Sequence, residues 1–395
     1  MSERLDKILK PKVDFWNDPR MRSIFFQSLV MGVVVVLGLY FINNAAINMK
    51  KNGIASGFEF MGQTAGFSIN QALIDYDESN SYGRAFLVSL INTILISVLG
   101  VIFATLLGFI VGIARLSSNW LIAKISEAYI EIFRNIPLLL QIFFWYFAVL
   151  RALPPAKTGI NVSDAFFLNL KGVFMPRPLF ESGFEIVVIA FAVALAIAIY
   201  IKRWAKKRQE KSGQQFPVFY TSLGLLIFLP FLFAMGTGFP MTWEYPVLKG
   251  FNFKGGIRIM PELVALLFAL SIYTAAFIAE IVRAGILSVS HGQTEAAYSV
   301  GLKPNLTLKL IIIPQALRVI VPPLTSQYLN LTKNSSLAAA IAYPDIVLVF
   351  AGTALMQTGQ AIEILGITMG VYLSLSLLIS SIMNWYNRSI SLKEK

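Results

Sequence analysis

Long apolar runs alternate with short polar segments along most of the chain. Several of these runs are about twenty residues long, which is enough for a helix to cross a hydrocarbon core of roughly 30 Å. Because lipid offers no hydrogen-bond partner to the backbone, each crossing segment is expected to be helical. The pattern predicts an all-α polytopic integral membrane protein with about eight transmembrane helices, at residues 24–43, 86–114, 128–150, 185–201, 217–236, 261–285, 311–332 and 362–384.

The composition supports this membrane assignment and removes several kinds of chemistry. Of the 395 residues, 56% are hydrophobic and 14% are charged, whereas soluble domains carry about 25% charged residues. The absence of cysteine excludes disulfides and thiolate chemistry, and the single histidine, His291, excludes a multi-histidine metal site. No Ser/His/Asp set or carboxylate pair stands in a recognisable catalytic context. We therefore expect no catalytic residues and no metal or cofactor bound by this chain.

The distribution of basic residues predicts the orientation of the chain in the membrane. Cytoplasmic loops carry an excess of Lys and Arg, so the net charge of +12 does not require a nucleic-acid partner. With the N-terminus in the cytoplasm, the cytoplasmic segments hold 19 basic residues, more than the outside loops hold. These are Arg4, Lys7, Lys10, Lys12, Arg20, Arg22, Arg115, Lys124, the basic residues from Lys202 to Lys211, Lys303, Lys309, Arg388, Lys393 and Lys395. Both termini and segment 286–310 are then cytoplasmic.

The remaining polar segments predict loops and one basic anchor. The basic run from Lys202 to Arg208 is typical of a topology anchor, and binding of anionic lipid head groups is the alternative. The outside loops 44–85 and 237–259 are rich in Gly, Asn, Ser and Asp, which predicts turns and short interfacial helices. No internal sequence repeat is evident, so a symmetric pore would require a second subunit.

A polar, turn-containing segment separates the predicted spans 261–285 and 311–332. Its marked residues, at fixed spacings, are Glu295, Ala296, Ala297, Gly301, Ile311, Ile313 and Pro314. The segment resembles the cytoplasmic EAA coupling loop of the membrane subunits of bacterial ABC importers, which usually has Leu where Ile313 stands. The resemblance implies that this loop transmits closure of a separate ATPase to the membrane domain. An ordinary polar connector is the alternative.

The local chemistry of this segment fits two short helices joined by a turn. Glu295 is expected to begin a helical stretch, and Gly301 permits a left-handed backbone. Lys303 and Pro304 then interrupt the helix, while Pro314 falls near the start of the next span, where a missing N–H costs little. The resemblance assigns the ATPase-coupling role to Glu295, Ala296, Ala297, Gly301 and Pro314.

A second motif runs from Tyr129 to Gln141 and pairs charges along a helix. It resembles the Y-x-E-x-x-R-x-x-P-L-L-x-Q stretch of amino-acid permeases. Glu131 and Arg134 are three residues apart and share a helix face, an arrangement that recurs in span 261–285. The four charged residues proposed for an inner gate or charge network are Glu131, Arg134, Glu280 and Arg283. Charges at a membrane boundary are costly unless paired or solvated, so simple anchoring of the helix ends is the alternative.

A third polar cluster interrupts apolar sequence near the end of span 311–332. Its members are Thr332, Lys333, Asn334, Ser335 and Ser336. After Pro322 and Pro323 loosen the helix, the cluster predicts a broken helix that lines a water-accessible cavity. The resemblance places it in the substrate pathway, where Lys333 would attract a carboxylate and hydroxyls would orient polar groups. Asn334 stands where many relatives have Asp, which favours broad substrate acceptance. The alternative position is the outer membrane surface.

The chain lacks the sequence signature of an ATPase. No G-x-x-x-x-G-K-[ST] phosphate-binding loop occurs in it, so ATP and Mg are expected to bind to partner subunits. The chain is therefore predicted to be a non-catalytic transmembrane subunit.

Over residues 86–385 the chain resembles a type I ABC importer permease, with a core of five helices and three additional helices. Its eight-span form resembles the Q-type permease of bacterial general L-amino acid importers. Residues 1–85 hold the cytoplasmic N-terminus, the first span and a periplasmic loop, and 151–255 is an insertion with two extra spans. Residues 386–395 form a cytoplasmic tail. The resemblance implies a bacterial inner-membrane complex with a second permease chain, two ABC ATPase subunits, a periplasmic amino-acid-binding protein, L-amino acid substrates and surrounding lipid.

Two other functions compete with this interpretation. An ion-gradient-driven secondary amino-acid transporter would require intramembrane carboxylates or repeated broken-helix ion sites, and the predicted spans have almost no such acid. A structural membrane subunit would leave the polar cluster at Lys333 and the inner charges without a role.

Overall fold

The computed structural model describes residues 18–51, 53 and 56–390. Most of the predicted cytoplasmic N-terminal segment and residues 391–395 lie outside the described residues. By internal contacts the chain divides into two units, one formed by Met1–Ile91 with Pro344–Leu375 and the other by Asn92–Tyr343 with Ser376–Lys395. The two units are described separately below.

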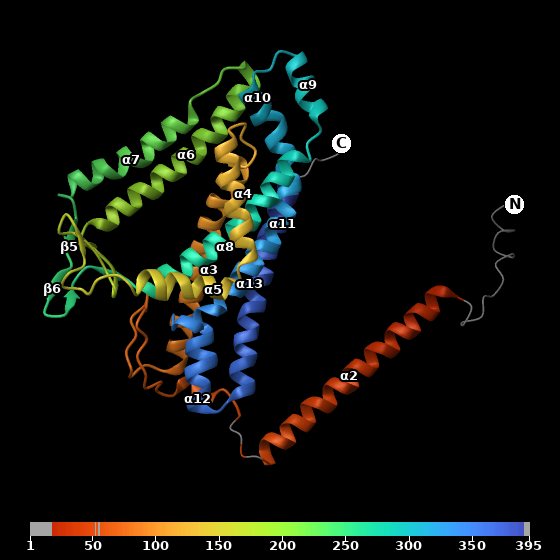
Figure 1. The fold of residues 1–395 in the computed structure, drawn as a ribbon, viewed down its shortest axis with the longest axis vertical. Helices are drawn as coiled ribbons and strands as arrows, with labels where there is room; N and C mark the ends of the chain where they lie inside the picture. Colours follow the sequence, from red (N-terminus) through yellow and green to blue (C-terminus); the bar gives the residue numbers. More distant parts are fainter. Residues whose placement is uncertain (1–17, 52, 54–55, 391–395) are drawn as a thin grey trace. The chain divides into compact units, whose positions relative to one another are not determined.

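The helices of the described residues match the predicted number of spans (Figure 1). Seven are long and apolar enough to cross a membrane, and one bent helix pair is an eighth candidate. The seven are α2 (Pro19–Lys51), α3 (Tyr82–Ala114), α6 (Phe184–Ser212), α7 (Val218–Gly236), α8 (Pro261–Leu287), the run Pro304–Ile341, and α13 (Ala361–Ile390). Large apolar side chains remain exposed along these helices, as expected of surfaces that face lipid.

The first unit packs a small core around the loop that follows α2. The 3₁₀ helix η1 (Glu59–Gly62) places Phe60 against Phe350 of the π-helical segment η5 (Val347–Ala354), which continues into α12 (Leu355–Thr358). Tyr82 donates a hydrogen bond to the Oε1 atom of Gln357 at 2.7 Å. Helix α2 has no buried residue.

The predicted span 128–150 is corrected by the structure, because it begins earlier and is broken in the middle. Helix α4 (Trp120–Asn135) is followed by α5 (Leu138–Phe143) and the π-helical segment η2 (Phe144–Leu150), at an angle of 105°. The break falls at Pro137, which has no N–H to continue the α4 ladder and forces the preceding residue into an extended conformation.

The core of the second unit is built around α8, whose small side chains allow close helix packing. Ala265, Ala269 and Ala276 are fully buried. Gly108 and Gly112 of α3 lie four residues apart against α8, and a Cβ on either glycine would come within 2.6 Å of α8 atoms. This small-xxx-small spacing lets helix backbones approach closely in a membrane protein.

Helix α8 also packs against the run Pro304–Ile341, which is longer than predicted. This run consists of α10 (Pro304–Thr307), the π-helical segment η3 (Leu308–Ile312), α11 (Ile313–Asn334) and the 3₁₀ helix η4 (Ser335–Ile341). At the Lys333 cluster, where a broken helix was expected, α11 ends at Asn334 and tightens into the 3₁₀ helix η4, but the span is not interrupted there, and Pro322 and Pro323 lie inside α11. The chain turns only at Ala342, whose φ is +58°.

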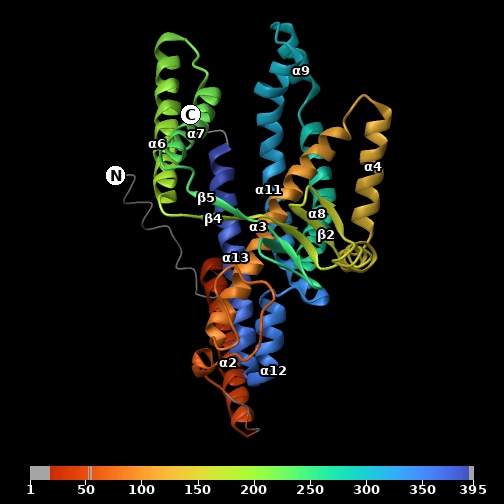
Figure 2. The same ribbon diagram turned by 90° about the vertical axis from the view of Figure 1, so that its left-hand side faces the viewer.

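Helices α6 and α7 form a hairpin and lie side by side (Figures 1 and 2). Short antiparallel strands connect the hairpin to its neighbours. One sheet has the order β1 (Ile160–Val162), β2 (Phe166–Asn169), β3 (Gly172–Met175), β8 (Ile257–Ile259); the other pairs are β4 (Arg177–Phe180) with β5 (Met241–Glu244) and β6 (Val247–Lys249) with β7 (Asn252–Lys254). The expected turns occur in 237–259, for example at Gly250 between β6 and β7, but the expected short helices are wrong, because strands β5–β8 stand in their place. The rings of Phe167 in β2 and Phe174 in β3 each pack against the ring of Phe253 in β7, with centroids 4.6 Å apart. These contacts join strands that are distant in the sequence.

Candidate functional site

The segment after α8 forms the two short helices that the sequence predicts. Helix α9 (His291–Ser299) begins four residues before Glu295, so the expectation that Glu295 starts the helix is corrected. Serine 290 occupies the N-cap position, and the carboxylate of Glu295 instead lies 3.0 Å from Nδ1 of His291, one turn back. Both side chains are exposed.

Gly301 ends α9 in a Schellman motif. The N–H of Leu302 donates to the carbonyl of Ala297 at 3.1 Å, and the N–H of Gly301 donates to the carbonyl of Tyr298 at 2.9 Å. Gly301 itself has φ +80°, a left-handed conformation that a Cβ disfavours. The turn is therefore defined by hydrogen bonds. Lys303 then caps α10, with Pro304 at its first position.

The surface of this segment is unusually apolar for an exposed helical turn. Ala297 is buried, but Ala296 and Gly301 are exposed. Val300 is 75% exposed and Tyr298 is 49% exposed. Pro314 lies in the first turn of α11, directly after the π-helical segment η3, so the segment passes into the next span without a loop. We call residues His291–Thr307 the coupling segment.

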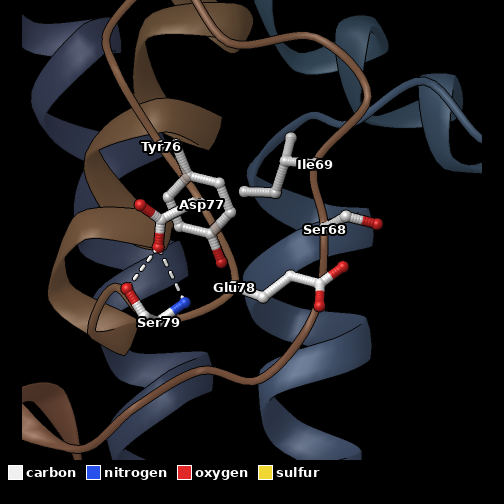
Figure 3. Close-up of a pocket in the computed structure, with 6 residues that line it drawn as sticks. All are labelled: Ser68, Ile69, Tyr76, Asp77, Glu78 and Ser79. Atoms are coloured by element: carbon white, nitrogen blue, oxygen red, sulfur yellow. Dashed lines mark hydrogen bonds between the residues drawn. The ribbon is translucent and has the colours of Figure 1, made fainter.

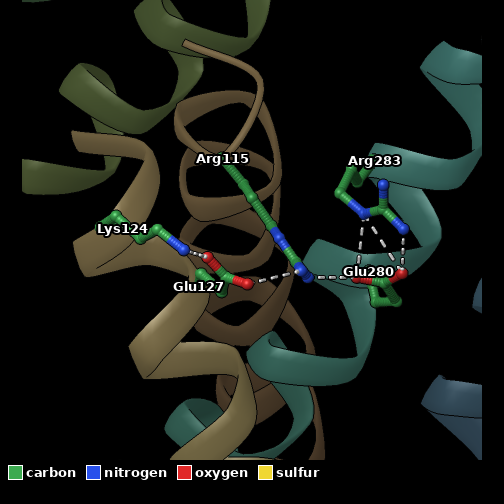
Figure 4. Close-up of polar contacts among 5 residues, drawn as sticks. All are labelled: Arg115, Lys124, Glu127, Glu280 and Arg283. Atoms are coloured by element: carbon green, nitrogen blue, oxygen red, sulfur yellow. Dashed lines mark hydrogen bonds and ion pairs between the residues drawn. The ribbon is translucent and has the colours of Figure 1, made fainter. Parts of the chain in front are cut away.

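Charged side chains from three helices meet near the end of α8 (Figure 4). Arg115, just after α3, donates through Nη1 to Oε2 of Glu280 at 2.7 Å, and its Nη2 lies 3.8 Å from Oε1 of Glu127 in α4. Nη2 of Arg283 lies 2.7 Å from Oε1 of Glu280 on the same helix, α8. Nζ of Lys124 lies 2.8 Å from Oε2 of Glu127 on α4. Arg115 and Glu280 are 19% and 27% exposed, so water screens their pair less than it screens the pair of Lys124 with Glu127, which are 56% and 39% exposed.

The structure revises the membership of the predicted inner charge network. Glu280 and Arg283 pair as expected, but Glu131 and Arg134 form no ion pair among the described residues. The guanidinium of Arg134 instead lies over the ring of Phe277, 5.2 Å from its centroid. Glu131 is exposed, and the attraction between exposed charges three residues apart is too weak to dictate their geometry.

The network members that the sequence did not predict are Arg115, Lys124 and Glu127. Arg115 and Glu280 are 165 positions apart, so no local spacing could reveal their contact. In the sequence, Arg115 lies between two predicted spans. That position indicated a cytoplasmic loop but not a contact with Glu280.

The motif from Tyr129 to Gln141 has a packing role in the structure. The hydroxyl of Tyr129 donates to the carbonyl of Ile272 in α8 at 2.7 Å. The Nε2 atom of Gln141 donates to the carbonyls of Phe133 and Ile136 on the other side of the helix break, at 3.0 and 2.9 Å. Gln141 therefore holds the bend between α4 and α5.

The polar cluster at the end of α11 divides into buried and accessible members. The hydroxyl of Thr332 donates to the carbonyl of Tyr328, and that of Ser335 donates to the carbonyl of Thr332; both side chains are buried. Lys333 is exposed, whereas Asn334 and Ser336 are half-buried. Lys333 forms no ion pair among the described residues.

The polar hollow in the first unit is explained by local turn chemistry (Figure 3). It has a volume of about 470 Å³ and is lined by Ser68, Ile69, Tyr76, Asp77, Glu78 and Ser79. The carboxylate of Asp77 accepts hydrogen bonds from the hydroxyl and N–H of Ser79, which hold the pKa of Asp77 below its ordinary value. In the described part of the chain no group of three His, Cys, Asp or Glu residues is arranged to hold a metal ion.

These features define a multi-pass helical membrane protein with a capped, exposed helical segment between two candidate spans. The chain belongs to the family of binding-protein-dependent transport system inner membrane components, whose family model matches residues 104–392.

Three curated relatives match over nearly their whole length. A putative amino-acid ABC transporter permease protein, YhdX of Escherichia coli (strain K12), is 51% identical over 100% of both chains. The general L-amino acid transport system permease protein AapQ of Rhizobium johnstonii is 49% identical over 96% of this chain and 94% of the relative. The glutamate/glutamine/aspartate/asparagine transport system permease protein BztB of Rhodobacter capsulatus is 42% identical over 96% of each chain.

Proposed function

We propose that this chain is the transmembrane permease subunit of an ATP-driven importer that carries L-amino acids, with broad specificity, across a bacterial inner membrane. The observation that carries the proposal is the coupling segment, which combines a hydrogen-bonded turn with exposed apolar side chains at Tyr298 and Val300. Such a segment suits docking into a groove of a partner. The names of AapQ and BztB support amino acids as the substrates and several amino acids per transporter.

The proposed complex supplies what this chain lacks. A second, related permease chain completes the pathway, two ABC subunits bind ATP and Mg, and a periplasmic amino-acid-binding protein delivers the substrate. The family description, which names binding-protein-dependent transport, supports this last partner. Both termini and the coupling segment face the cytoplasm in this proposal, as the excess of basic residues in those segments supports.

Coupling follows from the connection between the docking surface and the spans. The coupling segment begins four residues after α8 ends at Leu287, so movement of α9 acts directly on the end of α8. Glu280, near that end, is joined through Arg115 to Glu127 of α4. ATPase closure would therefore move α8 together with the ends of α3 and α4 at the inner mouth. The two access states must differ in their affinity for ATP or substrate for this switch to work.

The substrate pathway is proposed to include the accessible part of the α11 cluster. Lys333 has an exposed ammonium group that suits the carboxylate shared by all L-amino acids. Asn334 supplies a neutral amide beside it, at a position where a fixed carboxylate would select basic side chains. The hydroxyls of Thr332, Ser335 and Ser336 already donate to backbone carbonyls, so their proposed role in the pathway is to shape the turn into η4.

The test of coupling uses the left-handed conformation of Gly301. The complete complex would be reconstituted in proteoliposomes, and uptake of labelled L-amino acids would be measured with and without ATP. Gly301→Val should reduce uptake strongly, because a β-branched residue at φ +80° costs about 1–3 kcal/mol. Gly301→Asn should retain uptake because asparagine tolerates this region. Gly359→Val, at φ +69° in open space, introduces the same β-branched strain away from the coupling segment and is the matched control.

The same assay separates the candidate functions. Uptake that proceeds without ATP and follows an ion gradient would replace this proposal with secondary transport. Equal uptake by Gly301→Val and wild type would remove the coupling role. For the pathway, Lys333→Ala should raise the substrate concentration needed for half-maximal uptake, Lys333→Arg should restore it in part, and Lys249→Ala, at an exposed lysine of β6, should leave it unchanged.

A further inference from the structure

A basic hollow lies on α6, apart from the coupling segment and the charge network. Its volume is about 530 Å³, and its lining residues are Tyr200, Arg203, Trp204, Lys206, Lys207 and Glu210. All six come from the second half of α6, where the helix changes from apolar to charged sequence. We call this feature the α6 hollow.

The α6 hollow has an excess of positive charge. Lys206 lies 4.0 Å from Glu210, but the two side chains are 80% and 63% exposed, so their attraction is weak. Arg203 and Lys207 form no ion pair among the described residues. Two cations one helical turn apart are therefore available to an anionic group, and arginine in particular forms strong, directed hydrogen bonds to phosphate oxygens.

The aromatic wall of the hollow is held in place by the hairpin. The ring of Trp204 packs edge-on against Phe216, in the turn between α6 and α7, with centroids 5.4 Å apart. The guanidinium of Arg208 lies 5.4 Å from the centroid of the same ring. On the opposite face of α6, a stripe of buried alanines packs the helix: Ala190, Ala194, Ala198 and Ala205. The orientation of Trp204 is thus fixed by neighbouring side chains.

The length of α6 places the hollow at the level of lipid phosphates. The apolar part, residues 184–201, is about 27 Å long at 1.5 Å per residue, close to a hydrocarbon core of roughly 30 Å. The segment from Lys202 to Ser212 therefore extends beyond the hydrocarbon. Tyr200 and Trp204 lie at this boundary, where aromatic rings with one polar group are favoured.

An apolar strip leads from the hollow along the same face of the helix. Val193, Ile197, Tyr200 and Trp204 follow one another at spacings of three or four residues, so they share a face. Val193 is 47% exposed and Ile197 is 39% exposed. A soluble phosphate ion would not contact this apolar strip, whereas the acyl chains of a lipid would pack against it.

We propose that the α6 hollow binds the head group of an anionic glycerophospholipid. Arg203 and Lys207 contact the phosphate oxygens, Tyr200 and Trp204 pack beside the glycerol, and the acyl chains follow Val193 and Ile197. The lipid would attach the α6–α7 hairpin to one leaflet of the membrane.

The test compares two variants that remove the same charge from α6. Arg203→Gln/Lys207→Gln removes cations from the hollow, and Lys202→Gln/Lys211→Gln removes cations outside its lining. The complete complex would be placed in phosphatidylcholine nanodiscs with and without phosphatidylglycerol, and the phosphatidylglycerol retained after purification would be measured by native mass spectrometry. We expect the first variant to retain roughly tenfold less phosphatidylglycerol than wild type. The second variant should retain nearly as much as wild type.

Three outcomes would overturn the proposal. Equal loss in both double variants would show diffuse electrostatic attraction without a site. Displacement of phosphatidylglycerol by inorganic phosphate at matched ionic strength would identify a free anion as the ligand. Loss of the lipid from Arg203→Gln/Lys207→Gln together with a changed fluorescence of Trp204, which packs on Phe216, would show that folding of the hairpin, not charge in the hollow, had been measured.

Discussion

The bend between α4 and α5 depends on one buried amide. Pro137 has no N–H, so the carbonyl of Phe133, four residues earlier, loses the partner that a continuous helix would provide. The Nε2 atom of Gln141 donates to that carbonyl at 3.0 Å and to the carbonyl of Ile136 at 2.9 Å. Gln141 is only 4% exposed, so water does not easily replace it. We predict that Gln141→Leu destabilises the protein.

The magnitude follows from the groups that the substitution leaves unpaired. A fully buried acceptor without a partner costs about 1–3 kcal/mol, so the two carbonyls, which accept partly buried hydrogen bonds, together cost at most roughly 2–6 kcal/mol. The substitution also removes Oε1 of Gln141, a buried atom without a hydrogen-bond partner in the described residues, and this offsets roughly 1–2 kcal/mol. The free energy of unfolding should therefore fall by about 2–3 kcal/mol at the middle of these ranges, and by at most about 5 kcal/mol.

A double-mutant cycle with Pro137→Ala tests this explanation. Alanine restores an N–H at position 137, which can serve the Phe133 carbonyl, so Gln141→Leu should cost less in that background. Unfolding in mixed detergent micelles, followed by tryptophan fluorescence, would give each free energy. A coupling energy of about 1 kcal/mol or more is expected, and additivity within roughly 0.5 kcal/mol would refute the reasoning. Gln27→Leu is the control, because the amide of Gln27 bonds only an exposed hydroxyl among described residues.

Three further predictions use packing, charge and protonation. Gly112→Ala places a Cβ 2.6 Å from a carbonyl oxygen of α8, so the unfolding free energy should fall by about 1–3 kcal/mol; Gly366→Ala, which meets nothing within 4 Å, should retain it in the same assay. Arg115→Gln should lower the number of substrate molecules taken up per ATP hydrolysed in proteoliposomes. An unchanged ratio would show that the contact of Arg115 with Glu280 does not link α8 to α4 in transport. Burial raises the pKa of Asp345, which lies between candidate spans, to about 7, so stability should fall as pH rises from 3.8 toward 7; thermal unfolding of Asp345→Asn should lack this dependence.

The sequence by itself determined the spans and the turn of the coupling segment. Runs of about twenty apolar residues must become helices in lipid wherever they occur, so their number and approximate position needed no tertiary information. The same holds for Gly301, because the left-handed end of α9 is a local requirement that favours glycine. The predicted span 128–150 ran through Pro137, although a proline is a local signal of a helix boundary, and the bend of 105° there was not predicted.

Only the tertiary structure decided which side chains meet across helices. The spacing of Glu131 and Arg134 allowed a pair, but Phe277 of α8 takes the guanidinium instead. Arg115 reaches Glu280 across 165 positions because the glycines of α3 bring that helix close to α8. The strands between spans also depend on pairing between distant segments, as with Val173 opposite Ile259. Local pattern specifies which groups are available, but contacts between distant residues exist only once the helices and strands have packed.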